Sequence, residues 1–138
     1  MSDAFVLLPE HDIRNQHGAP GWHELTTDDP EAAAEFLRST FGWDVVAAEI
    51  AGSPYWLILV SGHQVGGIRA PQPGDTAVPR WDTYITVEDV DTVASVANRA
   101  GAVPVVPPVD LGDEGRVTVF HHAAAGTVAA FQYPRPFS

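Results

Sequence analysis

The chain repeats itself at a period of about 60 residues, and this repeat limits the folds open to it more than any other feature. Trp22–Asp29 leads into residues 30–42, and Trp81–Asp89 leads into residues 90–101. Matching positions are 81 − 22 = 59, 89 − 29 = 60 and 101 − 42 = 59 residues apart. In each copy an alternating stretch is followed by an acidic turn, a helical period and a glycine. Such a repeat predicts two similar modules that pack together.

Each module is predicted to have the order βαβββ. In the first module strands are expected at 22–27, 43–50, 55–60 and 65–69, with a helix that starts after the N-cap Asp29 and ends at Gly42. In the second module they are expected at 80–87, 103–106, 116–121 and 127–133, with a helix at 90–100 and a longer loop at 107–115. The Gly66-Gly67 pair, matched with Gly126 at 126 − 66 = 60, is assigned to close strand packing. The predicted fold class is α+β, with two modules forming a U-shaped mixed sheet around a cleft.

One domain accounts for the whole chain, since 138 residues suit a single core. We divide it into an N-terminal arm (1–19), a first module (20–70), a Pro- and Gly-rich linker (71–79) and a second module (80–134). The short linker predicts that the modules pack together or exchange with a second chain. No apolar run is long enough for a membrane helix and the N-terminus has no basic secretory region, so we expect no membrane contact and a cytoplasmic location.

The charge balance excludes whole classes of partner. Eighteen acidic residues stand against seven basic ones, all arginine, for a net charge of −11. Nucleic acids and anionic membranes require clustered positive charge, so neither is expected as a partner. An acidic cleft would instead concentrate cationic ligands, although a negative surface also serves solubility alone. With no cysteine, disulfides, thiol nucleophiles and cysteine metal sites are excluded.

Several short motifs point to a known family. They are Trp22-x-Glu24-Leu25, Asp29, Phe36, Phe41-Gly42-Trp43, Gly66-Gly67, Trp81 and Val87–Asp91. Together with the tandem βαβββ order, they resemble the vicinal oxygen chelate superfamily, which contains glyoxalase I, bleomycin-resistance proteins and extradiol dioxygenases. The similarity is strongest to its glyoxalase-like, hydroxylase-type branch and spans residues 20–134. It implies a homodimer and a scaffold that hosts lyases, dioxygenases and binders alike.

The resemblance also implies where metal ligands would lie. In metal-dependent members each half supplies a His or Gln at the start of its first strand and a Glu near the end of its last. Here those positions fall on Trp22, Asp82, Ala70 and Ala130, and of these only Asp82 can bind a divalent ion. The resemblance therefore predicts a site without a metal. The alternative, one divalent metal ion, remains open because a shift of one residue would bring in His23, and His121 or His122 could approach from a neighbouring strand.

Six residues are predicted to bind a ligand. Trp22 and Glu24 share one face of the first strand, as Asp82 and Tyr84 do on the fifth, and rings with carboxylates suit a small aromatic or cationic ligand. Trp56 lies in a strand too apolar for periodicity to assign its face, and Arg116 is the candidate for an anionic group. The opposing interpretation is that the tryptophans fill the core and the acids are solvated.

The predicted function is a small-molecule-binding protein of the glyoxalase/bleomycin-resistance type, acting by metal-free sequestration or antibiotic resistance. The alternative is a metal-dependent lyase, isomerase or dioxygenase of the same superfamily, and a protein-interaction role is a third. The sequence assigns no catalytic residue, so whether the chain is an enzyme stays open at this point.

Overall fold

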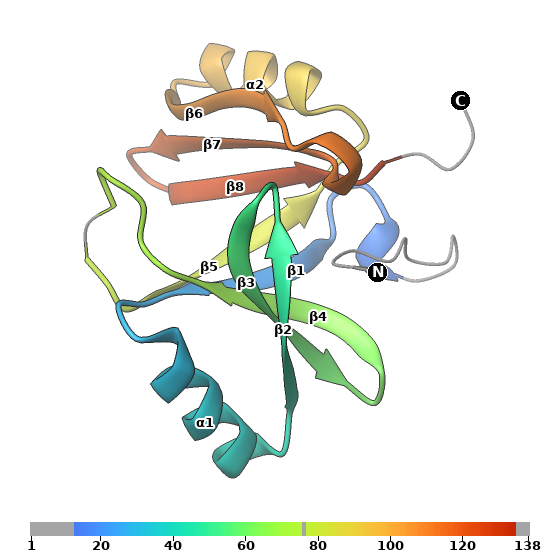
Figure 1. Cartoon of the computed structure of the whole chain (residues 1–138). Coiled ribbons are helices and arrows are strands. Elements are labelled where there is room, and N and C mark those ends of the chain that lie inside the picture. Colours follow the sequence, from blue (N-terminus) through green and yellow to red (C-terminus); the bar gives the residue numbers. More distant parts are fainter. Residues whose placement is uncertain (1–12, 76, 135–138) are drawn as a thin grey trace. The chain divides into compact units, whose positions relative to one another are not determined.

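The computed structural model describes residues 13–75 and 77–134, which contain eight strands and two α-helices (Figure 1). The elements are β1 (Pro20–Thr26), α1 (Pro30–Phe41), β2 (Asp44–Ile50), β3 (Ser53–Val60), β4 (His63–Arg69), β5 (Arg80–Thr86), α2 (Val90–Arg99), β6 (Val103–Asp110), β7 (Arg116–His122) and β8 (Gly126–Gln132). Two 3-10 turns, η1 (Ile13–Asn15) and η2 (Gly112–Glu114), complete the order. The predicted α+β class and the two βαβββ modules are confirmed. Neither helix is long and apolar enough to cross a membrane.

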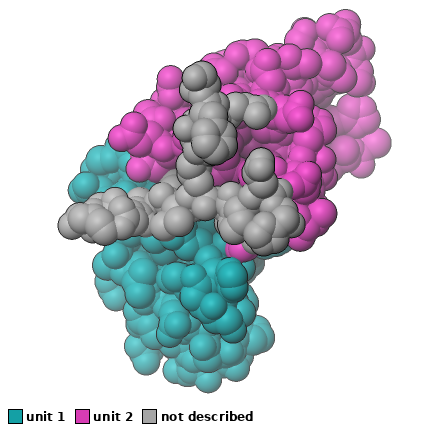
Figure 2. Space-filling view, turned by 90° about the vertical axis from the view of Figure 1, so that its right-hand side faces the viewer, with its two compact units in different colours: residues 1–6, 22–82 teal, residues 7–21, 83–138 magenta. Residues whose placement is uncertain are grey.

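The chain divides into two compact units, coloured separately in Figure 2. The described part of unit 1 is 22–75 and 77–82, and that of unit 2 is 13–21 and 83–134. The strand order is β2-β3-β4-β1 in the first module and β5-β8-β7-β6 in the second. In both, the first strand of the module pairs in parallel with the last, and the other pairs are antiparallel. Of the predicted N-terminal arm, residues 1–12 lie outside the described residues.

Helix α1 covers one face of the sheet in unit 1. Its N-cap is Asp29, whose carboxylate accepts the Ala32 N–H at 3.1 Å, and it ends at Gly42 in the left-handed region (φ 70°). The core beneath it is made of Leu25, Ala34, Leu37, Val45, Ile58 and Ile68. Because side chains alternate along a strand, Trp22, Glu24 and Thr26 point to the opposite face, away from α1.

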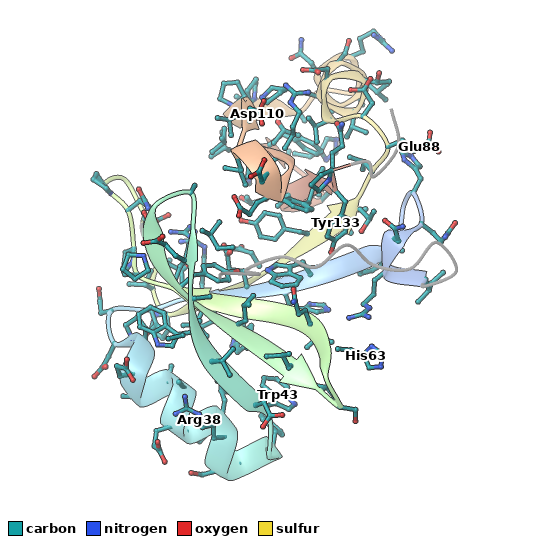
Figure 3. All side chains as sticks on the ribbon, turned by 45° about the vertical axis from the view of Figure 1, so that its right-hand side comes forward. Arg38, Trp43, His63, Glu88, Asp110 and Tyr133 are labelled. Atoms are coloured by element: carbon teal, nitrogen blue, oxygen red, sulfur yellow. The ribbon has the colours of Figure 1, made fainter. Side chains whose placement is uncertain are left out.

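Trp43 has a structural role just beyond the end of α1. Its ring stacks on Phe41 at 4.9 Å, and Arg38 in the last turn of α1 donates to the Val45 carbonyl at 2.6 Å. Figure 3 labels Arg38 and Trp43 in this region. These contacts fix where the chain leaves α1 and enters β2.

Unit 2 is built in the same way around a smaller core of Val87, Val90 and Ala130, against which Ile85 and Val93 pack. Ile85 faces this core, so Asp82, Tyr84 and Thr86 project from the other face of β5. Each module thus presents a helix-covered face and an opposite face that carries the candidate ligand-binding residues of its first strand.

The loop predicted at 107–115 is confirmed for residues 111–115 and is wrong for 107–110, because β6 continues to Asp110 through Pro107 and Pro108. A proline cannot donate to a ladder, but β6 ends the strand order and its pairing with β7 is interrupted by two register shifts, between Pro104 and Val106 and between Val106 and Val109. At an edge and at a bulge the missing N–H costs little.

Strand pairing also corrects the predicted alignment of the two halves of the chain. β1 and β5 match at 80 − 20 = 60, so Trp22 is equivalent to Asp82, and Trp81, which is 49% exposed, is equivalent to Gly21. In the last strands Arg69 lies opposite Thr26 and Phe131 opposite Thr86, an offset of 131 − 69 = 62. The offset grows because residues 111–115 join β6 to β7, whereas only 51 and 52 join β2 to β3. Matching Gly66 with Gly126, and hence Ala70 with Ala130, was wrong by two residues.

Candidate functional site

A row of hydrogen-bonded side chains crosses the face of unit 1 that points away from α1. The Trp22 indole N–H donates to the Tyr55 hydroxyl at 2.9 Å, and that hydroxyl donates to Glu24 Oε2 at 2.7 Å. All three residues are buried. Gly67 makes this possible, since a Cβ there would collide with the Tyr55 ring. The close strand packing predicted for Gly66-Gly67 is thereby confirmed.

Beyond Glu24 the row continues as alternating charges, which we call the charge ladder: Glu24, Arg69, Asp75, Arg80 and Asp82. Arg69 bridges the first two acids, with Nε 3.0 Å from Glu24 Oε1 and Nη1 3.0 Å from Asp75 Oδ2. Arg80 bridges the next two, with Nη2 3.1 Å from Asp75 Oδ1 and Nε 2.8 Å from Asp82 Oδ2. Side-chain exposure is lowest at Glu24, at 10%, and highest at Arg80 and Asp82, at 30% and 25%, with Arg69 and Asp75 between them at 22% and 15%.

Hydrogen bonding keeps the middle of the charge ladder ionised. Burial alone would raise the pKa of Asp75, but hydrogen bonds from Arg69, from the Gln72 backbone N–H at 2.6 Å and from Arg80 outweigh it and hold that pKa well below its ordinary value. Burial would likewise lower the pKa of Arg69, and its bonds to Asp75 and Glu24 raise it above the ordinary value instead. Three carboxylates against two guanidiniums leave the ladder with a formal charge of −3 + 2 = −1.

The residues at the implied ligand positions do not fit a metal ion. Trp22 offers only an indole N–H, already bonded to Tyr55, and Ala130 is fully buried in the unit 2 core. Ala70 has no donor, and Asp82 is paired with Arg80. At the corrected offset of 62 residues Ala130 is matched with Ile68 and Ala70 with Gln132, whose Oε1 accepts the Val90 N–H. Across residues 13–75 and 77–134, no three His, Asp or Glu side chains come together in a group that could hold a metal.

The three histidines named as alternative metal ligands, His23, His121 and His122, do not form a metal-binding group. His23 is exposed and faces the opposite side of β1 from Glu24. His122 Nδ1 accepts the backbone N–H groups of Ala124 and Ala125 in the turn before β8, and His121 Nδ1 is 3.1 Å from Thr127 Oγ1. These contacts of His121 and His122 stabilise the turn between β7 and β8.

The other predicted site residues have separate surroundings. Trp56 packs against the core under α1, and its indole N–H is 3.3 Å from Glu31 Oε2 of that helix. Tyr84 is half-buried on the face of β5 that Asp82 shares. Arg116 is paired with Asp91 in the first turn of α2. The structure thus joins Trp22, Glu24 and Asp82 in one row, while ligand contacts of Trp56, Tyr84 and Arg116 stay predictions.

Sequence reasoning missed four members of the row: Tyr55, Arg69, Asp75 and Arg80. A signal for three of them was present, because Arg69 ends the predicted fourth strand, Arg80 begins the fifth, and Asp75 is the acid in the linker between them. Arginines on either side of a short loop are placed to form charge-assisted hydrogen bonds with the one acid inside it. Tyr55 had no such signal, since its strand is apolar throughout.

A small hollow in unit 2 is a less suitable site. It measures about 110 Å³ and is lined mainly by Ala94, Ala97, Pro104, Pro107, Pro108 and Phe120, between α2 and strands β6 and β7. Pockets for drug-sized ligands measure roughly 300–1,000 Å³. The charge ladder is therefore the better candidate.

Curated proteins of similar sequence match most of this chain. The chain is 33% identical over 124 residues to "Putative glyoxylase CFP32" of Mycobacterium bovis, covering 87% of this chain and 48% of that protein. It is 26% identical over 131 residues to "Anthracycline biosynthesis protein DnrV" of Streptomyces peucetius, covering 83% and 47%. The chain thus spans about half the length of these curated relatives.

Solved structures share the fold at low identity. A methylmalonyl-CoA epimerase of Streptomyces coelicolor in complex with 2-nitronate-propionyl-CoA superposes with a TM-score of 0.65 at 17% identity, over 87% of this chain and 100% of that one. The sequence profile of one family matches residues 19–128, most of the chain. The chain therefore belongs to the Glyoxalase/Bleomycin resistance protein/Dioxygenase superfamily.

Proposed function

We propose that this chain binds a small molecule without the help of a metal ion, as proteins of sequestration or resistance do. The charge ladder is the observation that carries this proposal. Its carboxylates, which a divalent ion would need, are bonded to two guanidiniums whose positive charge repels such an ion. A metal would also need about four to eight donors.

The ligand we propose is a small aromatic molecule. Trp22 and Tyr55 are joined to the charge ladder by hydrogen bonds that end at Glu24, and Tyr84 shares a strand face with Asp82. One relative is named for anthracycline biosynthesis, and anthracyclines are planar fused-ring aromatics. A positive charge on the ligand, as the sequence predicts, stays part of the proposal, because the ladder has a small net negative charge.

A homodimer in the cytoplasm is the expected setting, and sedimentation of the purified chain tests the dimer.

Equilibrium dialysis with an anthracycline, a cationic aromatic dye and an anionic aromatic dye tests the proposal. We expect saturable binding of at least one of them, unchanged by chelator or by added Ni²⁺, Zn²⁺ or Mn²⁺. Arg69→Gln breaks the ladder and should weaken binding, whereas Arg99→Gln, which removes an exposed guanidinium bonded to Ser95 on α2, should not. Binding that chelator abolishes and a metal restores would establish the metal-dependent alternative instead.

A further inference from the structure

Asp75 is held as proteins hold the acidic group of a bound ligand. Three donors converge on its carboxylate: Arg69 Nη1, Arg80 Nη2 and the Gln72 N–H, at 3.0, 3.1 and 2.6 Å. Paired guanidiniums with a backbone N–H are a common means of binding carboxylates and phosphates. We propose that Arg69 and Arg80 form an oxyanion site for an acidic group of the ligand of the proposed function, on which this inference rests; the positive charge proposed for that ligand is then on another part of the molecule. Asp75 occupies the site as an internal carboxylate that the ligand displaces.

The two arginines are held from behind, so the site stays formed when Asp75 leaves. Glu24 and Asp82 bind the Nε atoms of Arg69 and Arg80, while Arg69 Nη1 and Arg80 Nη2 donate to Asp75. Arg69 Nη1 is also 3.2 Å from the Ala70 carbonyl. Glu24 is itself fixed by the Tyr55 hydroxyl. Donors that are already oriented bind more tightly than donors that must be ordered. Without Asp75 the charge of the ladder rises from −1 to 0, and an incoming anion meets two guanidiniums.

The fold does not require these charges at these positions, as unit 2 demonstrates. The equivalent of Arg69 is Phe131, which packs edge-on against Tyr133 with ring centres 4.8 Å apart. The equivalents of Glu24 and Arg80 at the 60-residue offset are Tyr84 and Pro20. Buried ion pairs are often no more stable than apolar residues of similar size, because desolvation offsets their attraction. Charges that the same strands can do without are better explained by ligand binding.

A second observation comes from Thr26, which lies opposite Arg69 and on the same face of the sheet. Its hydroxyl is buried and has no hydrogen-bond partner among the described residues. In unit 2 the equivalent Thr86 donates its hydroxyl to the Arg14 carbonyl. Buried hydroxyls normally find a partner. An oxyanion bound at Arg69 would bring an acceptor within reach of Thr26.

Exchange at the site leaves the sheet intact. Asp75 belongs to no strand, since it lies between β4 and β5, and the side chains of Arg69 and Arg80 are 22% and 30% exposed. A ligand can therefore approach the guanidiniums from solvent while β1 and β4 remain paired.

Titration with two oxyanions that lack rings, inorganic phosphate and malonate, tests the inference. Asp75→Ala should bind at least one of them about tenfold or more tightly than the wild type does, and the preferred one identifies the ligand's group as phosphate or carboxylate. Adding Arg80→Gln to Asp75→Ala should abolish that gain. The matched control is Glu35→Ala, which releases the single exposed Arg38 and should give no gain. A natively folded Asp75→Ala that binds neither anion better than the wild type overturns the inference.

A measurement on the wild type covers the case in which Asp75→Ala fails to fold. The side-chain Nε–H signals of Arg69 and Arg80 should shift in NMR spectra during titration with the same anions, while those of Arg38 and Arg99 remain in place. Unmoved Arg69 and Arg80 signals would overturn the inference. Because these probes have no ring, a negative result here leaves aromatic binding in the dialysis experiment intact, and the two proposals can fail separately.

Discussion

At the scale of single residues, a glycine decides where an acid is placed. Gly67 lies opposite Glu24, and the Tyr55 ring occupies the space where a side chain at Gly67 would be. Tyr55 in turn links Trp22 to Glu24 by two hydrogen bonds. The first part of the row therefore depends on the absence of a methyl group.

We predict that Gly67→Ala displaces the Tyr55 ring and destabilises the fold by about 1–3 kcal/mol, because overpacking and the loss of two buried hydrogen bonds act together. Urea unfolding measures the change. The control is the same substitution in a Tyr55→Ala background, where the methyl group has room and the cost should be much smaller. Equal costs in the two backgrounds would show that the ring is not what Gly67 accommodates.

Asp75 makes stability depend on pH in a defined direction. Its pKa is below the ordinary value in the folded chain, so the unfolded chain binds the proton more readily. The stabilisation from its ion pairs is thus fully present above the unfolded pKa of about 4 and is lost as the pH falls below it towards the folded pKa. Unfolding of wild type and Asp75→Asn, compared at a series of acidic pH values, should show the gap between them closing as the pH falls. A gap that is constant with pH would contradict this assignment.

At the scale of elements, the helix ends were the most predictable features. Asp29, Pro30 and Gly42 are local signals, because a cap or a left-handed turn depends on residues within one helical turn. We predict that Asp29→Ala destabilises the chain by about 1 kcal/mol, the usual cost of losing an N-cap. Asp28→Ala removes an exposed charge next to it and serves as control in the same thermal or urea unfolding measurement. Equal effects of the two substitutions would mean that the charge, not the cap, is what matters.

Longer-range features of the elements were predicted less well. The extent of β6 was missed because Pro107 and Pro108 argue against a strand unless its edge position is known. The register of β8 was off by two because connection lengths between strands are not visible in a matched motif. Faces of strands were predicted where polar and apolar residues alternate, as at Trp22 and Glu24, and not in the uniformly apolar stretch around Trp56.

The site was predicted in part for the same reason. Glu24 and Asp82 were placed on the correct faces by alternation, but their pairing with Arg69 and Arg80 depends on contacts between residues distant in sequence, such as the 45 positions between Glu24 and Arg69. Such contacts follow from the register of β1 with β4, which a single sequence does not reveal.

At the scale of the whole molecule, the two modules share one fold but differ in the contacts that equivalent side chains make. Thr26 and Thr86 are the clearest matched pair, at 86 − 26 = 60, each buried at the end of the first strand of its module. Their hydroxyls differ, because Thr86 donates to the Arg14 carbonyl and Thr26 has no hydrogen-bond partner within residues 13–75 and 77–134.

Substituting each threonine by valine, which has nearly the same volume, distinguishes the roles of the two hydroxyls. Thr86→Val should destabilise the chain by about 1–2 kcal/mol, since the partly buried Arg14 carbonyl loses the hydroxyl that donates to it. Thr26→Val should leave the stability unchanged or raise it, since it removes a buried hydroxyl that has no partner to lose. Urea unfolding of both variants in the same buffer, without phosphate or carboxylates, makes the comparison. If Thr26→Val instead costs as much as Thr86→Val, the Thr26 hydroxyl is hydrogen-bonded in the folded chain. Thr26 would then have no part in the oxyanion site. The proposed roles of Arg69 and Arg80 would still be tested by the anion titration.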